Sequence, residues 1–103
     1  MIFLEYEKLL SLRNAMLDRL NEEIQNTSFE SANAQLEEMD KRIEEKRKEL
    51  RSSKHTYDKV YRMRFLDCLR VEKIAMALNY ETSSVYRILR KIGKEIKVAK
   101  KYH

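Results

Sequence analysis

Polar and basic residues recur at helical spacing along residues 82–94, and they are suited to contact with a polyanion. Arg87 and Arg90 are the best candidates for bidentate hydrogen bonds to guanine O6 and N7 in a major groove. An exposed run of Arg and Lys is usually only solvated charge. An ordinary surface helix, however, mixes positive and negative residues, whereas residues 82–94 contain no Asp or Glu. This absence weakens the interpretation as solvated charge. Hydroxyls and a helix N-terminus could donate to phosphates. The predicted DNA-binding residues are Thr82, Ser83, Ser84, Tyr86, Arg87, Arg90, Lys91 and Lys94, with Lys73 upstream.

Residues 71–90 have the order that a helix-turn-helix needs. Ala75 is small enough for two helices to cross closely, and Val85 resumes an apolar face that would fix the second helix against the first. Asn79 lies between them, and Asn is one of the few non-glycine residues that tolerate a positive φ. We therefore predict two helices joined by a left-handed turn, the second being the helix that would enter the major groove.

This segment resembles the helix-turn-helix of the last DNA-binding region of bacterial sigma factors, and it looks closest to sigma-like phage transcriptional regulators of the ArpU and RinA type. The resemblance covers about the last half of the chain. It implies a phage or mobile-element regulator that binds promoter or operator DNA, and it leaves RNA polymerase open as a further partner. The chain is too short to hold the regions with which sigma factors bind the polymerase core and melt promoters. The residues that carry the resemblance are Ile74-Ala75, Leu78-Asn79-Tyr80 and Ser84–Leu89, with Val60–Phe65 as the preceding helix.

Length and composition favour a small all-α protein. The 103 residues include no Pro and one Gly, which is hard to reconcile with a sheet full of tight turns. No apolar run approaches the length of a membrane span, and the first residues carry Glu5 and Glu7 where a signal peptide would be basic. Cys68 is the single cysteine; we expect it to pack in a core. Without an internal disulfide, a cytoplasmic location is expected, in the bacterial host if the protein is phage-encoded.

No catalytic constellation is present in the sequence. It has no Gly-rich phosphate loop, no carboxylate pair in a plausible cleft and no nucleophile with a spaced base. The two histidines, His55 and His103, are isolated, which argues against a metal site. We therefore expect no enzyme activity, no cofactor, no metal and no small-molecule substrate.

Charge divides the chain into two unlike halves. Residues 1–50 contain 8 Lys and Arg against 12 Asp and Glu, a balance of −4, whereas residues 51–103 contain 14 against 5, a balance of +9. Such asymmetry suggests that one half binds a polyanion and the other has a different task. Together with the helix-turn-helix spacing, it favours duplex DNA as the partner.

The first fifty residues predict two helices of similar length. Apolar residues recur at alternating spacings of 3 and 4, which is a heptad seam, over residues 3–24 and again, out of register, over residues 29–50. Thr27 and Glu30 fit a capping box, so a new helix is expected between the seams. A short connection favours an antiparallel hairpin or coiled coil. The charged seam residues Arg13 and Lys46 should lie near the bundle ends or extend to solvent.

The first helix has more apolar surface than one partner helix would cover, because Ile2, Leu9 and Met16 widen its stripe. We therefore predict that two hairpins pack together in a homodimer. Two alternatives stay open: the hairpin folds back onto the C-terminal half, or one continuous helix with a stutter forms a longer coiled coil. The predicted dimerisation residues are Phe3, Tyr6, Leu10, Leu17, Leu20, Ile24, Leu36, Met39 and Ile43.

The expected organisation is a helical hairpin for dimerisation or partner binding (residues 1–50), a polar linker (51–56) and a helix-turn-helix domain (57–103). Thr56 fits the N-cap of a helix that runs to about Leu66, with Asp58 placed for its dipole. The two helices of the motif should span about residues 71–78 and 82–99.

The preferred function is a sequence-specific transcriptional regulator. One alternative is a DNA-recognition component of viral DNA packaging, in which the coiled-coil half builds a ring. The other is an adaptor whose acidic helices bind a protein partner such as RNA polymerase or a repressor.

Overall fold

The computed structural model describes residues 1–23 and 29–101, and within these residues the chain is helical and holds no strand, as the composition predicts. The capping box expected at Thr27 lies outside the described residues. No described helix is long and apolar enough to cross a bilayer. The elements are α1 (Ile2–Glu23), α2 (Phe29–Ser52), α3 (Thr56–Tyr61), the π-helical turn η1 (Arg62–Leu66), α4 (Val71–Leu78) and α5 (Thr82–Lys101).

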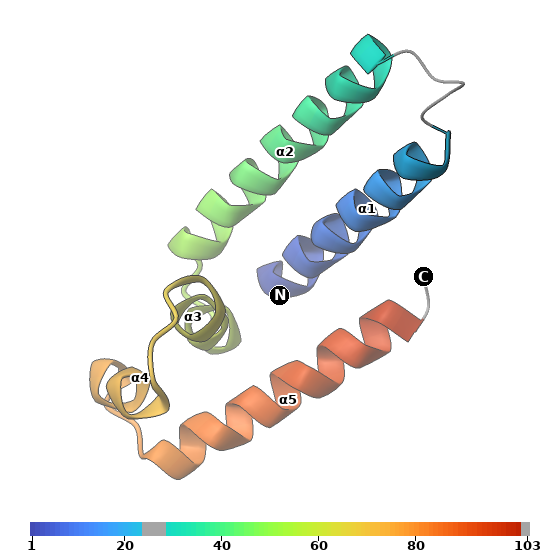
Figure 1. The fold of residues 1–103 in the computed structure, drawn as a ribbon. Helices are drawn as coiled ribbons and strands as arrows, with labels where there is room; N and C mark the ends of the chain where they lie inside the picture. Colours follow the sequence, from blue (N-terminus) through green and yellow to red (C-terminus); the bar gives the residue numbers. More distant parts are fainter. Residues whose placement is uncertain (24–28, 102–103) are drawn as a thin grey trace.

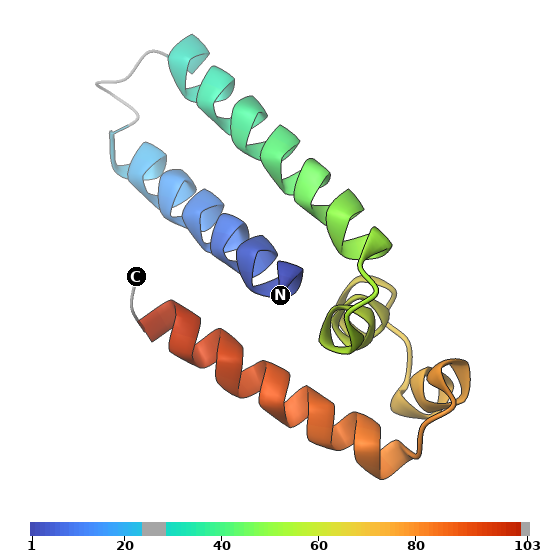
Figure 2. The same cartoon turned by 180° about the vertical axis from the view of Figure 1, so that it is seen from behind.

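The N-terminal helices fold back onto the C-terminal half. Figure 1 shows α1 and α2 side by side and antiparallel, with α3 near the end at which α2 finishes and α1 begins. From α4, helix α5 runs back toward α1 and contacts it, and α3 contacts α1, α2 and α5. Figure 2 shows the same arrangement from behind. This is the first of the two alternatives to the dimer; the homodimer itself stays a prediction, since the structure holds a single chain.

One hydrophobic core joins all five α-helices. The linker expected over residues 51–56 is shorter in the structure, because α2 continues to Ser52 and α3 begins at Thr56. The helices before and after this linker contribute buried side chains to the same core, so the linker does not divide the chain into two domains with separate cores. The buried residues of this core are Phe3, Tyr6, Ile43, Leu50, Val60, Tyr61, Val71, Ile74, Ala75, Val85 and Ile92.

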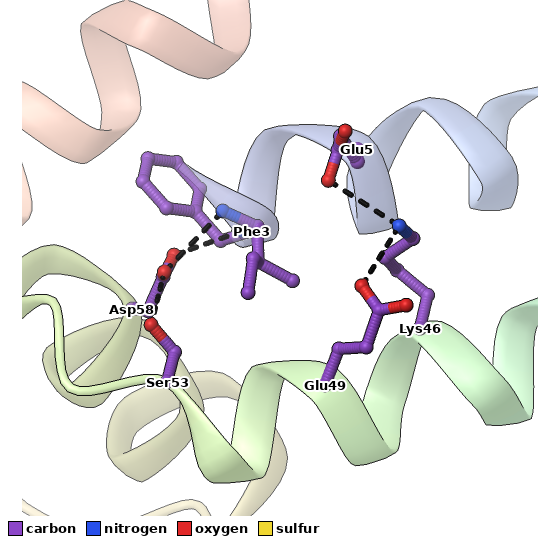
Figure 3. A network of polar contacts seen from close by, with 7 residues as sticks. Phe3, Glu5, Lys46, Glu49, Ser53 and Asp58 are labelled. Carbon is purple, nitrogen blue, oxygen red and sulfur yellow. Dashed lines mark hydrogen bonds and ion pairs between the residues drawn. The ribbon is translucent and has the colours of Figure 1, made fainter.

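Asp58 fixes the start of α1 although it belongs to α3. Its carboxylate accepts hydrogen bonds from the backbone N–H groups of Phe3 (2.9 Å) and Ile2 (3.3 Å) and from the Ser53 hydroxyl (2.6 Å), as Figure 3 shows. The first N–H groups of a helix have no partner inside it, and they form the positive end of its dipole. Only 1% of Asp58 is exposed, and these three donors satisfy the buried carboxylate.

The cap of α3 is His55, and the expectation that Thr56 would cap this helix is wrong. Nδ1 of His55 accepts from the backbone N–H of Tyr57 at 3.2 Å, and His55 has the extended backbone of an N-cap residue. Thr56 is already the first residue of the helix. Asp58 lies in the first turn of α3, as expected for the dipole of that helix, and its carboxylate in addition accepts from the start of α1.

The two charged seam residues reach solvent across the hairpin, as predicted. Arg13 of α1 pairs with Asp40 of α2 at 2.7 Å. Lys46 of α2 lies between Glu49 (3.0 Å) and Glu5 of α1 (3.3 Å), which Figure 3 also shows. The hydrogen bond to Glu49, with a smaller effect from Glu5, raises the pKa of Lys46, although partial burial acts against it. Pairs of this kind at the surface contribute little stability.

Tyr61 is the aromatic centre of the fold. Its ring stacks on Phe3 with 5.3 Å between centroids and lies 4.9 Å from the ring of Phe65. Its hydroxyl donates to Oε1 of Glu7 at 2.5 Å, and the other carboxylate oxygen of Glu7 lies 3.7 Å from Nζ of Lys100 on α5. Burial raises the pKa of Tyr61, and the bond to Glu7 raises it further. These contacts tie α1, α3 and α5 together.

Candidate nucleic-acid interface

A left-handed turn joins α4 to α5, and the prediction of that turn at Asn79 is confirmed. Asn79 has φ 59° and ψ 44°. The N–H of Tyr80 donates to the carbonyl of Ala75 at 2.8 Å, and that of Asn79 donates to Met76 at 3.3 Å. This pair of bonds is a Schellman motif, which satisfies the last carbonyls of a helix and turns the chain. Ala75 is buried, as close contact between α4 and α5 requires.

Helix α5 starts at Thr82, close to the expected start of the second helix of the motif, and Glu81 precedes it. The carbonyl of Glu81 accepts from the N–H groups of Ser84 (3.1 Å) and Val85 (3.2 Å). Thr82 and Ser83 are exposed and Ser84 is half-buried. Their hydroxyls therefore lie in the first turn, beside N–H groups that an anion could approach.

The predicted contact face of α5 is exposed. Val85 and Ile92 are fully buried on the opposite face, which turns the polar positions outward. Five of the predicted contact residues are cations: Lys73, Arg87, Arg90, Lys91 and Lys94. Among residues 1–23 and 29–101, none of the ion pairs involves one of these five cations. The exposed members of this face are Tyr86, Arg87, Arg90, Lys91 and Lys94 on α5, and Lys73 is exposed on α4.

The structure adds Arg70 to the candidate interface. Arg70 is exposed and precedes α4 as its N-cap residue, with an extended backbone (φ −72°, ψ 153°). It lines a shallow hollow of about 360 Å³ together with Lys73 and Cys68. The sequence signal that could have found Arg70 is its spacing of three residues from Lys73, at which side chains are neighbours on a helix. A second upstream arginine, Arg62, is instead held by the chain itself, because its guanidinium donates to the carbonyl of Arg51.

Cys68 is exposed, and the expectation that it packs in a core is wrong. It lies in the connection from η1 to α4 with a φ of 56°. The neighbouring N–H groups of Asp67 and Leu69 donate to Arg62 and Met63, each at 2.9 Å. These bonds reverse the chain at Cys68 and direct its side chain to solvent.

Several residues expected to join two copies lie inside this chain. Phe3, Tyr6 and Ile43 are buried in the shared core, so they have almost no surface left for a partner. Ile24 lies outside the described residues. The other predicted dimerisation residues are half-buried: Leu10, Leu17, Leu20, Leu36 and Met39.

Comparison of the chain with known protein families, curated proteins and solved structures found no match. The resemblance to sigma-like regulators therefore stays a prediction that rests on the residues of α4 and α5. In the part of the chain that the structure describes, no three His, Cys, Asp or Glu side chains form a group that could hold a metal ion.

Proposed function

We propose that the chain is a duplex-DNA-binding transcriptional regulator whose helix α5 enters the major groove. The observation that carries the proposal is the exposed face of α5, which presents Arg87 and Arg90 without an acidic partner among the described residues. A major groove about 12 Å wide admits one α-helix. The left-handed turn at Asn79 sets α4 against α5, which is how a helix-turn-helix holds its second helix for docking.

Each part of the surface has a chemical role in this proposal. Arg87 and Arg90 read guanine through bidentate hydrogen bonds, and Tyr86 contacts a phosphate or a thymine methyl group. Lys91 and Lys94 attract the backbone without regard to sequence. Phosphates are further bound by the hydroxyls and N–H groups at the start of α5 and by the basic residues near the start of α4.

The regulatory part of the proposal rests on the resemblance to sigma-like phage regulators. Under that proposal the target is promoter or operator DNA of a phage or mobile element. The resemblance leaves RNA polymerase open as a further partner. The exposed basic surface supports the DNA-binding part independently of the resemblance.

The test is selection of bound sequences from a randomised duplex DNA pool at two salt concentrations. An enriched motif is expected, with binding that weakens as salt rises because counterions are released from neutralised phosphates. Salt-sensitive binding without any enriched motif would leave only phosphate attraction and would overturn sequence-specific regulation. Absence of binding at both salt concentrations would overturn the DNA interface and favour the adaptor function of the acidic helices.

A further inference from the structure

Gly93 is the single glycine of the chain, and it lies in the interior of α5. The helix continues through it from Thr82 to Lys101, and Figure 1 shows α5 as one unbroken helix. Apart from Pro, Gly is the least favourable residue in a helix interior, because it loses the most backbone entropy on folding. Gly93 does not have a positive φ that would require Gly. The helix therefore carries a destabilising residue without a conformational reason.

Packing inside the molecule gives no reason for this glycine either. Gly93 is exposed. Apart from the adjacent residues and the local helix backbone, no atom in the part of the chain that the structure describes lies within 4 Å of the position that a Cβ would occupy. A use of Gly that fits an open surface is to let a ligand approach the backbone closely.

Gly93 belongs to a stripe of exposed residues that is suited to a polyanion. Residues three or four apart are neighbours on a helix surface, and this spacing joins Tyr86, Arg90, Gly93 and Lys97, all of them exposed. Among the described residues, neither Arg90 nor Lys97 takes part in an ion pair. Glu95 is two positions from Gly93, and residues at that spacing do not face each other. Gly93 is thus a gap in the side-chain layer with a cation about one turn away on each side.

The length of α5 places Gly93 near the edge of a major groove. The helix has 20 residues, which is about 30 Å at about 1.5 Å per residue. A major groove is about 12 Å wide and curves around the duplex, so a straight helix of this length leaves it. Gly93 lies eleven residues after Thr82, or about 16 Å along the helix. When the first turns of α5 lie in the groove, Gly93 therefore meets the phosphate strand at its edge.

We propose that Gly93 is the point at which the sugar-phosphate backbone of duplex DNA passes against α5, with Lys97 bound to a phosphate beside it. The inference rests on the proposed function, because it concerns the same helix and the same partner. It does not need sequence-specific reading or regulation, since contacts to phosphate carry no sequence information. Any side chain at position 93 would hold the strand away from the helix and from Lys97.

Fluorescence anisotropy with a short duplex of mixed sequence at low salt tests the inference. Gly93→Leu should raise the Kd at least about tenfold, and Gly93→Ala should raise it by a smaller factor. Both variants should also raise the urea midpoint of unfolding, since Ala and Leu are better helix formers than Gly. Weaker binding by a more stable chain is a combination that loss of structure does not produce.

Ala34→Leu is the matched control, because Ala34 is exposed on α2 and its enlargement should leave the Kd unchanged. Lys97→Ala should weaken binding in the wild-type background. It should have a smaller effect in the Gly93→Leu background, because the strand is there already held away from Lys97. Equal effects of Lys97→Ala in the two backgrounds would contradict the inference.

The remaining outcomes separate this inference from the proposed function. If both Gly93 variants bind the duplex as tightly as the wild type, the inference is overturned and the DNA-binding function stands. Equal losses for Ala and Leu would assign the effect to the flexibility of α5 and not to open space, and would also overturn the inference. A wild-type chain that does not bind the duplex would overturn the proposed function itself. Circular dichroism reports helix content, and Gly93→Ala decides the matter if Gly93→Leu loses it.

Discussion

At the residue scale, two side chains hold a left-handed backbone but are unequally suited to it. Asn79 and Cys68 have φ values of 59° and 56°. Asn tolerates this region because its short polar side chain can hydrogen-bond locally, whereas the left-handed region strains other residues with a Cβ by about 1–2 kcal/mol. The turn at Asn79 is therefore well matched to its residue, and the turn at Cys68 stores strain.

Cys68→Gly should raise the free energy of unfolding by about 0.5–1 kcal/mol, because relief of the strain exceeds the added entropy of the unfolded chain. Urea unfolding followed by circular dichroism measures the change. Cys68→Ala is the control and should give no such gain, since it keeps the Cβ. Equal effects of the Gly and Ala variants would show that the thiol, and not the backbone, causes the change.

Arg87→Ala or Arg90→Ala should weaken binding to the selected DNA site by about 1–3 kcal/mol and relax the choice of one base pair. Lys94→Ala should instead weaken binding to all sequences similarly and lower the salt slope by about one. Fluorescence anisotropy with matched and mismatched duplexes measures both effects. Lys41→Ala on α2 is the control for loss of one exposed positive charge. If both arginine variants bind the site as tightly as the wild type, the contact face of α5 is misassigned.

At the scale of elements, the junction between α1 and α3 depends on polar groups as well as on aromatic packing. Asp58 accepts from the first N–H groups of α1, and Tyr61 donates to Glu7 one turn further along α1. Both groups belong to α3, a helix of six residues. A helix this short is not stable alone, so its stability and the position of α1 depend on the same contacts.

Asp58→Ala should lower the free energy of unfolding by about 2–3 kcal/mol, because it leaves the start of α1 without its charged acceptor. His55→Ala, which removes only the local cap of α3, should cost about 0.5–1 kcal/mol. Urea unfolding of the two variants gives the comparison. A smaller loss for Asp58→Ala than for His55→Ala would mean that solvent caps α1 equally well.

Tyr61 should make the protein lose stability at high pH. Its pKa in the folded state is raised above the unfolded value of about 10. The folded state therefore keeps a proton that the unfolded chain releases, so this contribution is complete below about pH 10 and falls as the pH rises beyond it. Urea unfolding at pH 8 to 11 should show a steeper decline for the wild type than for Tyr61→Phe. Parallel declines would assign the pH dependence to other groups.

At the scale of the whole molecule, the acidic and basic halves share one core. Phe3 and Tyr6 from the first half pack with Tyr61, and α1 contacts α5 directly. The helix that carries the candidate DNA contacts is thus supported by the N-terminal helix. The homodimer predicted from the sequence would carry two such surfaces, and the DNA selected by it should then hold two half-sites about one helical turn apart or a multiple of that.

The shared core predicts one cooperative unfolding transition for the full chain. Circular dichroism, which reports the helices, and tyrosine fluorescence, which reports the surroundings of all six tyrosines, should give the same urea midpoint. Phe3→Ala should shift both midpoints together, since a truncated core phenylalanine costs about 3–5 kcal/mol. Two separated transitions would show that the N-terminal and C-terminal helices unfold independently.

Most of the candidate interface could be predicted from local sequence. The turn at Asn79 follows from a backbone preference of one residue, and the outward face of Arg87 and Arg90 follows from the helical spacing of Val85 and Ile92. Both signals act over a few residues, so no distant contact is needed to detect them. Arg70 has only the weak signal of lying three residues before Lys73, and the structure is needed to show that both side chains are exposed beside one hollow.

The sequence by itself determined that the protein is helical, where most helices lie, and which face of α5 is apolar. Only the tertiary structure decided that Asp58 caps α1, that Phe3 and Tyr6 lie within the chain's own core and that Cys68 is exposed. The physical reason is the range of the interactions. Periodicity and turn preference are properties of neighbouring residues, whereas Asp58 and Phe3 are 55 positions apart, and their contact exists only once α1, α2 and α3 have packed.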